Sequence, residues 1–387
     1  MTYQLSFFDS LLENNHAQNI ITPFITDGNV NISPEEWSVI RQNNTQARII
    51  DDFSEEILSG NIVLPLRQIS YRDMVDSFYE LLAYECNDYQ YGPVYSRYEY
   101  KYKMLDKYIS ESNVGNIASD YFHQENRFKC GSVNSPSPAR TWSNRIFLRG
   151  ALKSLFTMNH QQINMSTLRT CLCLRKYVAS QFKPAVAKSV YEKFGSRYVL
   201  DFSSGWGDRL CGFYAAKNTA HYVGIDPNSS LTHGYENQIA EYGKHVEGKS
   251  ASMICMPAEE VRLEKASVDT VFTSPPYFNV ERYSDDDTQS YKRYKGIDKW
   301  LSGFLFPAVE NAWNALQNGG NMVVNISDVY SGHRINKICD PMNDHIAHLG
   351  GEYVGCIGMK MSKRPNSKAA GHEGQTFIEP MWVWRKP

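Results

Sequence analysis

The fold is decided by the stretch Val271-Phe272-Thr273-Ser274-Pro275-Pro276-Tyr277. Two consecutive prolines fix φ, carry no backbone N–H, and keep the residues before them out of the helical region. The apolar strand that precedes them must therefore stop in a stiff corner, which carries a hydroxyl, backbone carbonyls and an aromatic ring. These groups suit a planar amine, and a strand-ending turn without a function is the simpler alternative.

Short β-like runs alternate with helix-length segments in the second half of the chain, which predicts a parallel, doubly wound sheet. The runs are Tyr198–Phe202, Tyr222–Ile225, Ser252–Met256, Val268–Thr273 and Asn321–Ile326. Two final runs, Tyr353–Met361 and Phe377–Trp384, are separated by a polar loop in which no helix fits. They predict an antiparallel hairpin that closes the sheet.

The remaining sequence predicts helices and a division into three parts. Residues 1–145 form an N-terminal, mainly helical region, residues 146–180 a basic helical connector, and residues 181–387 the α/β domain. Ser33-Pro34-Glu35-Glu36 predicts a helix start, with an N-cap, a proline and acids in the first turn. Tyrosines recur between Tyr71 and Tyr108, where we expect amphipathic helices with half-buried rings; stacking on bases is the alternative.

Composition places the chain among globular proteins of a reducing compartment. Of its 387 residues 42% are apolar, and no run of 18 apolar residues occurs, so no transmembrane helix is expected. The N-terminus lacks the basic and apolar regions of a signal peptide. Eight scattered cysteines fit neither a zinc ribbon nor a zinc finger. We expect a cytoplasmic protein with no metal and no membrane contact.

Positive charge is concentrated in the middle of the chain. Residues 126–200 contain 13 Lys and Arg but one acid, Glu192, whereas residues 1–125 contain 8 Lys and Arg and 19 acids. A basic strip of this kind predicts contact with a polyanion, or else neutralises the acidic segment within the fold. The candidate nucleic-acid-binding residues in the strip are Arg140, Arg145, Arg149, Arg175 and Lys176, and those in later loops are Arg282, Lys363 and Arg364.

A glycine-rich turn follows the first predicted strand of the α/β domain. Gly205 and Gly207 allow the backbone to pass close to a ligand at the carboxyl edge of the sheet, and a helix is predicted over Asp208–Lys217. The third glycine of the dinucleotide pattern G-x-G-x-x-G is replaced by Leu210. No pyrophosphate cradle is needed, which favours a nucleoside ligand without phosphates.

The next two strand ends add groups that suit a nucleoside. Asp226 ends the second strand, 19 residues after Gly207, where a carboxylate accepts hydrogen bonds from two ribose hydroxyls; a helix cap is the alternative. After the third strand, Met256, Pro257 and Ala258 offer backbone amides and an apolar wall to an adenine edge.

Taken together, these residues resemble the class I S-adenosylmethionine-dependent methyltransferases, and within them the DNA amino-methyltransferases that alkylate cytosine N4 or adenine N6. The similarity covers the chain from about Gln181 to its C-terminus. The family's cofactor glycine motif matches residues 201–207, its ribose-binding acid matches Asp226, and its (D/N/S)-P-P-(Y/F) motif matches residues 274–277. Its F-x-P segment, which helps to cover the methionine part of the cofactor, matches Phe182-Lys183-Pro184.

The resemblance implies a Rossmann-like sheet, S-adenosylmethionine as the cofactor and DNA as the partner, in the context of DNA methylation and restriction–modification. The implied catalytic residues are Ser274, Pro275, Pro276 and Tyr277. The implied cofactor-binding residues are Phe182, Pro184, Asp201, Ser203, Gly205, Gly207, Asp226, Met256, Pro257 and Ala258.

In such a site, Ser274 and the Pro275 carbonyl would accept the two N–H groups of the amine, and Tyr277 would stack on the base. Serine at the first motif position favours cytosine N4 over adenine N6. The chain departs from the family because its extra sequence lies mainly N-terminal, where residues 1–145 are a candidate target-recognition region. An RNA base amino-methyltransferase and an inactive nucleic-acid-binding protein with the same fold are the alternatives.

Overall fold

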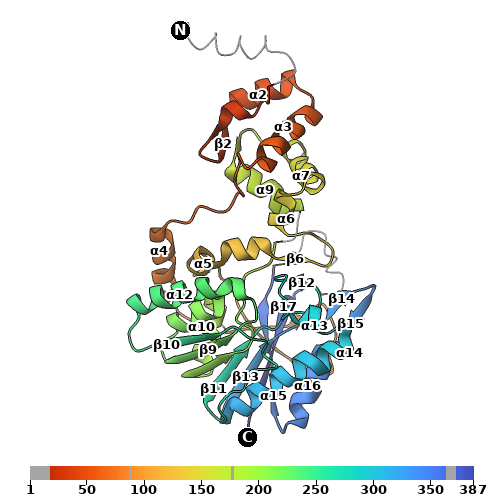
Figure 1. Cartoon of the computed structure of the whole chain (residues 1–387). Helices are drawn as coiled ribbons and strands as arrows, with labels where there is room; N and C mark the ends of the chain where they lie inside the picture. Colours follow the sequence, from red (N-terminus) through yellow and green to blue (C-terminus); the bar gives the residue numbers. More distant parts are fainter. Residues whose placement is uncertain (1–17, 87–88, 176–177, 363–371) are drawn as a thin grey trace. The chain divides into compact units, whose positions relative to one another are not determined.

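The computed structural model describes residues 18–86, 89–175, 178–362 and 372–387. The chain forms two compact units, drawn in Figure 1. Unit 1 comprises Met1–Gln68 and Asn134–Val178, and unit 2 comprises Ile69–Val133 and Ala179–Pro387. This division differs from the one expected from the sequence, because residues 69–133 belong with the α/β domain.

The sheet of unit 2 has the strand order β10-β9-β8-β11-β13-β17-β16-β5-β3. Its seven central strands are β8 (Tyr198–Asp201), β9 (His221–Ile225), β10 (Ser250–Ile254), β11 (Val268–Thr273), β13 (Leu316–Asn325), β16 (Glu352–Lys360) and β17 (Thr376–Arg385). The strands from β10 to β13 are parallel, and β17 is antiparallel to both of its neighbours. Numbered along the chain, these seven strands lie in the order 3-2-1-4-5-7-6. The predicted parallel sheet with a closing antiparallel hairpin is confirmed.

Three further strands come from the tyrosine-rich segment. β5 (Met104–Ile109) pairs with β16, β3 (Tyr89–Tyr91) pairs with β5, and β4 (Val94–Tyr95) pairs with β17. The expected helices are therefore wrong beyond α4 (Tyr71–Ala83). Tyrosine packs well on a pleated surface, and the free edge of β16 supplies backbone partners that a local pattern does not reveal.

Helices cover both faces of the sheet (Figure 1). On one side lie α5 (Asn116–Lys129), α10 (Pro184–Lys193), α11 (Asp208–Ala215) and α12 (Thr232–His245), together with α4. On the other lie α14 (Ile297–Trp300), the π-helix η3 (Leu301–Leu305), α15 (Phe306–Ala315) and α16 (Cys339–His348). Side chains alternate along β11. Val271 joins the core that contains Trp300, and Phe272 meets the ring of Tyr191 at 5.5 Å between centroids.

Trp300, Phe304 and Trp313, on the helices that follow the proline corner, are all buried in the core. The short elements of unit 2 are β6 (Gly131–Ser132), η2 (Ser229–Leu231), β12 (Glu281–Arg282), α13 (Ser290–Arg293), β14 (Val329–Ser331) and β15 (Arg334–Asn336). β12 pairs with β6, so the chain after the proline corner is attached to the segment that follows α5.

Unit 1 is mainly helical, as expected for the N-terminal region. Its elements are η1 (Thr22–Phe24), β1 (Ile25–Thr26), β2 (Asn29–Ile32), α2 (Pro34–Asn43), α3 (Gln46–Leu58), α6 (Pro138–Trp142), α7 (Arg145–Leu152), α8 (Ser154–Thr157), β7 (Ile163–Asn164) and α9 (Met165–Arg175). The predicted helix start is confirmed, because Ser33 and Glu36 form a capping box. Trp37 and Phe53 are buried in its core, with ring centroids 6.5 Å apart.

Among the described residues, every helix is too short or too polar to cross a membrane.

Candidate functional site

The turns that follow β8 and β11 leave the sheet side by side. β8 and β11 are adjacent parallel strands, with Val199 opposite Thr270 and Leu200 opposite Val271. The chain runs outward from β8 to β9 and β10 before it returns to β11, so the strand order reverses between β8 and β11. Ligands of doubly wound sheets bind at the carboxyl ends of the strands at such a switch point. The predicted glycine turn and the proline corner share this edge.

The glycine turn contains two residues with left-handed backbones. Gly205 has φ +59° and Gly207 has φ +71°, conformations that favour glycine. A Cβ on Gly207 would lie 2.1 Å from Oε1 of Gln238, so close packing also requires glycine there. Around Gly205, the nearest atom to such a Cβ is the Ser203 carbonyl at 3.9 Å. The backbone at Gly205 is thus the approachable part of the turn.

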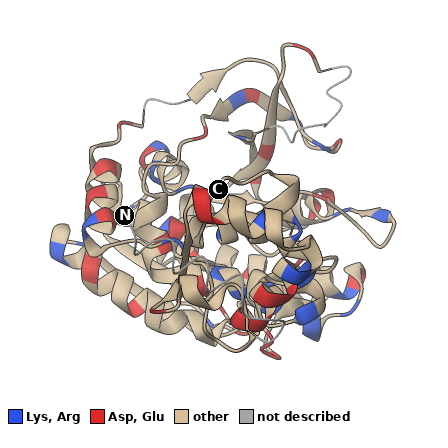
Figure 2. Cartoon of the chain, turned by 90° about the horizontal axis from the view of Figure 1, so that it is seen from above, with Lys and Arg blue, Asp and Glu red and all other residues tan. Residues whose placement is uncertain are grey.

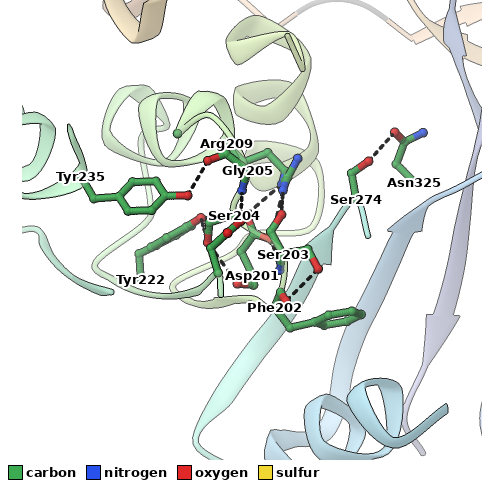
Figure 3. Close-up of polar contacts among 12 residues, drawn as sticks. Asp201, Phe202, Ser203, Ser204, Gly205, Arg209, Tyr222, Tyr235, Ser274 and Asn325 are labelled. Atoms are coloured by element: carbon green, nitrogen blue, oxygen red, sulfur yellow. Dashed lines mark hydrogen bonds and ion pairs between the residues drawn. The ribbon is translucent and has the colours of Figure 1, made fainter. Parts of the chain in front are cut away.

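Asp201 lies behind the turn, where its carboxylate is used within the protein (Figure 3). It is fully buried, and its Oδ2 accepts hydrogen bonds from Nε of Arg209 and the hydroxyl of Tyr222, each at 2.8 Å. Its Oδ1 accepts from the backbone N–H of Ser203 at 3.3 Å. The guanidinium of Arg209 also donates to the Ser203 carbonyl. This buried ion pair holds the turn in place, so the predicted cofactor residue Asp201 acts here on the turn itself.

Asp226 lies at the end of β9, as predicted, and faces the glycine turn. Its Oδ2 accepts the backbone N–H of Gly205 at 2.9 Å, and its Oδ1 accepts that of Asn228 at 3.0 Å. Burial raises the pKa of Asp226 to about 6, against the lowering effect of these two bonds. A carboxylate oxygen accepts more than one hydrogen bond. Asp226 is half-buried and keeps acceptor capacity for hydroxyl groups.

Phe182 and Ser203 flank the same turn. The Phe182 ring meets Phe272 edge-on at 5.6 Å, and the guanidinium of Arg209 lies 5.2 Å from its centroid. Pro184 is the buried first residue of α10. The Ser203 hydroxyl is half-buried and donates to the Phe202 carbonyl at 2.8 Å. The F-x-P segment and the glycine turn are thus brought together.

The predicted adenine wall after β10 is only partly on the surface. Met256 is 43% exposed, whereas Pro257 and Ala258 are buried, and Ala258 belongs to the core. The backbone N–H of Asp226 donates to the Ile254 carbonyl at 3.1 Å, so the ends of β9 and β10 are adjacent. The Met256 side chain is the apolar surface that this segment offers near Asp226.

At the proline corner, Ser274 is hydrogen-bonded to the neighbouring strand. Its hydroxyl donates to Oδ1 of Asn325, the last residue of β13, at 3.2 Å (Figure 3). Asn325 is itself held by a bond from its Nδ2 to the Pro380 carbonyl on β17, at 3.1 Å. Pro275 is buried and Pro276 is half-buried. With its single proton engaged by Asn325, the oxygen of Ser274 has lone pairs left to accept from a ligand.

Tyr277 and Glu379 complete the polar groups around Asn325. The Tyr277 hydroxyl donates to Oδ1 of Asn325 at 3.4 Å, and its ring packs against the core. Burial raises the pKa of Glu379 to about 6, against bonds from Tyr277 and Asn325. Burial and the Glu379 carboxylate raise the pKa of Tyr277 well above its ordinary value. Tyr277 is anchored at its hydroxyl end.

The backbone directly after the corner is strained. Phe278 has φ +55°, a left-handed conformation that costs of order 1–3 kcal/mol in a residue other than glycine. Its ring is buried and meets Trp300 at 5.8 Å between centroids. Packing against the core holds Phe278 in this conformation and fixes the direction in which the chain leaves the corner.

Sequence patterns did not identify several residues of this site. Arg209 is the second residue of α11 and resembles an ordinary surface arginine, although it is buried. Tyr235, whose hydroxyl donates to the Gly205 carbonyl, lies in a helix pattern without distinguishing features. Asn325 could have been identified from the sequence, because it lies at the end of the predicted strand that follows the proline corner. Asp328, in the same segment, caps α16 through bonds from the N–H groups of Ile338 and Cys339 at 2.8 and 3.0 Å.

Some of the arginines predicted to bind nucleic acid are exposed, whereas another is engaged in an ion pair within the protein. Arg140 and Arg145 are exposed in unit 1, whereas Arg149 forms an ion pair with Asp51 of α3. In unit 2, Arg282 is exposed on β12. Four more candidates cannot be placed: Lys176, Lys363 and Arg364 lie outside the described residues, as does the side chain of Arg175.

Part of the basic strip is neutralised inside the fold, which supports the alternative interpretation for those residues. Arg127 is buried and pairs with Asp120 at 2.6 Å, and the buried Lys188 donates to the carbonyls of Leu81 and Tyr84. Figure 2 shows basic and acidic residues interspersed along the helices. The residues that the structure describes contain no group of three or more His, Cys, Asp or Glu side chains that could hold a metal ion.

Comparison with known proteins gives structural similarity alone. No family model matches the chain, and no curated protein sequence matches it. Similar solved structures include the cyclase SpnF, which is 11% identical, with 53% of this chain and 81% of SpnF covered at a TM-score of 0.37. A methyltransferase dependent on S-adenosylmethionine from Methanosarcina mazei is 10% identical, with 51% of this chain and 96% of the other covered at a TM-score of 0.35. The N-methyltransferase NodS from Bradyrhizobium japonicum is also 10% identical, with coverages of 51% and 89% and a TM-score of 0.32. At these scores the fold assignment rests on the strand order of the chain itself.

Proposed function

We propose that this chain is an S-adenosylmethionine-dependent methyltransferase that methylates an exocyclic amine of a base in DNA, with cytosine N4 favoured and adenine N6 next. One observation carries the proposal. The glycine turn after β8 and the Ser-Pro-Pro-Tyr corner after β11 leave adjacent parallel strands at the same edge of the sheet. A cofactor held by the first turn would therefore lie beside an amine held by the second.

The residues around the glycine turn fit a nucleoside cofactor. The open backbone at Gly205, the half-buried carboxylate of Asp226 and the exposed Met256 offer a close approach, a hydroxyl acceptor and an apolar contact. Phe182 borders the same turn. Bound there, the cofactor supplies a methyl group on a positively charged sulfur.

The proline corner fits a planar amine. The lone pair of such an amine is delocalised into the ring, so catalysis must draw it out of conjugation. With its proton given to Asn325, Ser274 can accept one N–H of the amine, and the Pro275 carbonyl can accept the other. Two prolines and the bond from Asn325 to Pro380 hold these acceptors in place before the substrate arrives. Such preorganisation is a large part of transition-state stabilisation in enzymes.

The target base must leave the duplex or already be single-stranded, because its amine is otherwise buried in the base pair. The exposed residues Arg140, Arg145 and Arg282 are the described candidates for contact with phosphates. Binding would then weaken steeply as salt increases.

The proposal is tested by incubating the full chain with methyl-labelled S-adenosylmethionine and, separately, duplex DNA, single-stranded DNA and RNA of mixed sequence. Each product is digested to nucleosides and separated by chromatography. We expect label in N4-methyl-2′-deoxycytidine from DNA. Label from RNA alone would make the chain an RNA amino-methyltransferase. If calorimetry detects no cofactor binding, the chain would instead be an inactive nucleic-acid-binding protein with this fold.

A further inference from the structure

A short hairpin, β14–β15, follows directly on the candidate active site. β14 begins four residues after Asn325, the residue that accepts the bond from Ser274. Its two strands are antiparallel, with Ser331 opposite Arg334. Gly332 and His333 form the turn, each with φ +61°. Two-residue turns with both central φ angles positive match the twist of β-strands, so this hairpin is tight.

The hairpin is anchored, next to its turn, to the chain that leaves the proline corner. The hydroxyl of Ser331 donates to Oδ1 of Asn279 at 2.9 Å, and Asn279 lies two residues after Tyr277. Asn336 is buried and donates to the Ser331 carbonyl at 3.0 Å. Val329 is buried as well. These contacts hold the hairpin beside the candidate site.

Its remaining side chains are exposed. Tyr330 is 58% exposed and Ile335 is 51% exposed, although both are large and apolar. They are directly opposite each other in the antiparallel pair, so they lie on the same face of the hairpin. A single exposed apolar residue needs no explanation, but an aromatic and an aliphatic side chain paired on one face of a hairpin form a contact surface.

The charge of the hairpin indicates what this surface contacts. Residues 329–336 contain Arg334 and His333, both exposed, and no acid. A second exposed arginine, Arg282, follows Asn279 by three residues on the chain to which the hairpin is anchored. An aromatic face with adjacent cations suits bases and phosphates. Two apolar residues are too small a patch for a stable protein interface, which usually includes 20–30 residues a side.

We propose that the β14–β15 hairpin is a nucleic-acid-binding element, in which Tyr330 and Ile335 pack against a base next to the methyl-accepting base and Arg334 contacts a phosphate. The inference rests on the proposed function and adds to it the element that contacts the polynucleotide beside the site. Duplex DNA, single-stranded DNA and RNA share this chemistry, so the experiment includes all three.

The test is fluorescence anisotropy of the full chain with labelled 30-nucleotide probes of mixed sequence, as duplex DNA, single-stranded DNA and RNA. We expect Tyr330→Ala to weaken binding to the preferred probe between about fivefold and 100-fold, the range for loss of base stacking. Arg334→Gln should weaken binding and reduce the slope of log affinity against log salt by about 1, whereas Tyr330→Ala should leave that slope unchanged. The matched controls are Tyr91→Ala and Arg262→Gln, which alter exposed residues elsewhere in unit 2 and should bind as wild type.

Calorimetry with S-adenosylmethionine is performed on each variant, and its affinity should equal that of wild type. Wild-type affinity for the preferred probe in both Tyr330→Ala and Arg334→Gln would overturn the inference and leave the proposed function standing. A wild-type chain that binds none of the three probes would overturn both. Equal losses in the hairpin variants and in their controls would also overturn it, because the hairpin would then have no special role.

Discussion

Two polar clusters lie at the same edge of the sheet, and they differ in how completely the protein satisfies them. Behind the glycine turn, Asp201, Arg209 and Tyr222 are all buried, and Asp201 accepts hydrogen bonds from the other two. At the proline corner, Ser274 and Tyr277 are half-buried and share the single acceptor Oδ1 of Asn325.

This difference indicates that the two clusters have different roles. The first cluster contains opposite charges whose hydrogen bonds are made within the protein, so its expected role is to hold the backbone at Gly205 in position. In the second cluster the Ser274 hydroxyl uses its proton on Asn325 and keeps acceptor capacity on its oxygen, so its expected role is to bind a ligand. The comparison predicts that substitutions in the first cluster lower stability, whereas substitutions in the second lower methyl transfer.

The largest effect is expected for Asp201→Ala, which leaves the guanidinium of Arg209 buried without its partner. Removal of one member of a buried ion pair costs about 3–5 kcal/mol. Urea unfolding followed by circular dichroism measures this loss. Lys129→Ala is the control, since Lys129 forms an exposed pair with Glu125 and should cost at most about 1 kcal/mol. Equal losses in both variants would contradict the supporting role of Asp201.

Ser274→Ala should change catalysis and leave the cofactor affinity near that of wild type. Because the serine oxygen is proposed to accept an N–H as the amine loses its conjugation, we expect methyl transfer to fall by about tenfold to 100-fold. The measurements are label transfer under single-turnover conditions and calorimetry with cofactor. The exposed Ser302→Ala is the matched control. A loss of cofactor affinity without a loss of turnover would reverse the assignment of the two turns.

Asp226→Ala should show the opposite pattern. It removes the proposed ribose acceptor and the bond from the Gly205 N–H, and we expect cofactor affinity to fall about tenfold. Raising the cofactor concentration should restore most of the methyl transfer. If turnover stays low at saturating cofactor, Asp226 acts on the reacting groups and the separation of the two clusters is incorrect.

The smallest effect concerns pH. The pKa of Glu379 is raised from 4.5 to about 6, so the folded chain binds this proton more tightly than the unfolded chain does. The contribution of Glu379 to stability therefore falls as pH rises from about 4.5 to about 6, and the penalty is complete above that range. Glu379→Gln should raise the free energy of unfolding by about 1–2 kcal/mol at pH 8 and change it little at pH 4. A stabilisation that is equal at both pH values would contradict this cause.

The central strands could be predicted because each buried strand is short, apolar and bounded by turn residues. β11 was predicted to the residue, and β8 and β9 to within one residue at each end. β3 and β5 could not be predicted in this way. β5 pairs with β16, which lies about 250 residues further along the chain, and β3 pairs with β5. Only the long-range pairing with β16 selects strand over helix for this tyrosine-rich segment.

The site shows the same limit. Gly205, Asp226 and Ser274 were predicted because glycine, a strand-ending acid and paired prolines carry local signals. Arg209 and Glu379 carry none, since their importance comes from burial next to residues on other elements. A sequence pattern therefore predicts the groups that face a ligand better than the groups that hold them.

The interleaving of the two units along the chain has a consequence for fragments and for synthesis. Residues 18–68 leave the ribosome well before residues 134–178, with which they form unit 1. Unit 1 can therefore be completed only after residues 69–133, which belong to unit 2, have been synthesised. A fragment that begins at residue 181 would lose β3, β5, α4 and α5, and it would expose the free edge of β16, a template for aggregation. A self-sufficient fragment of unit 2 must instead join residues 69–133 to residues 179–387 through a new linker.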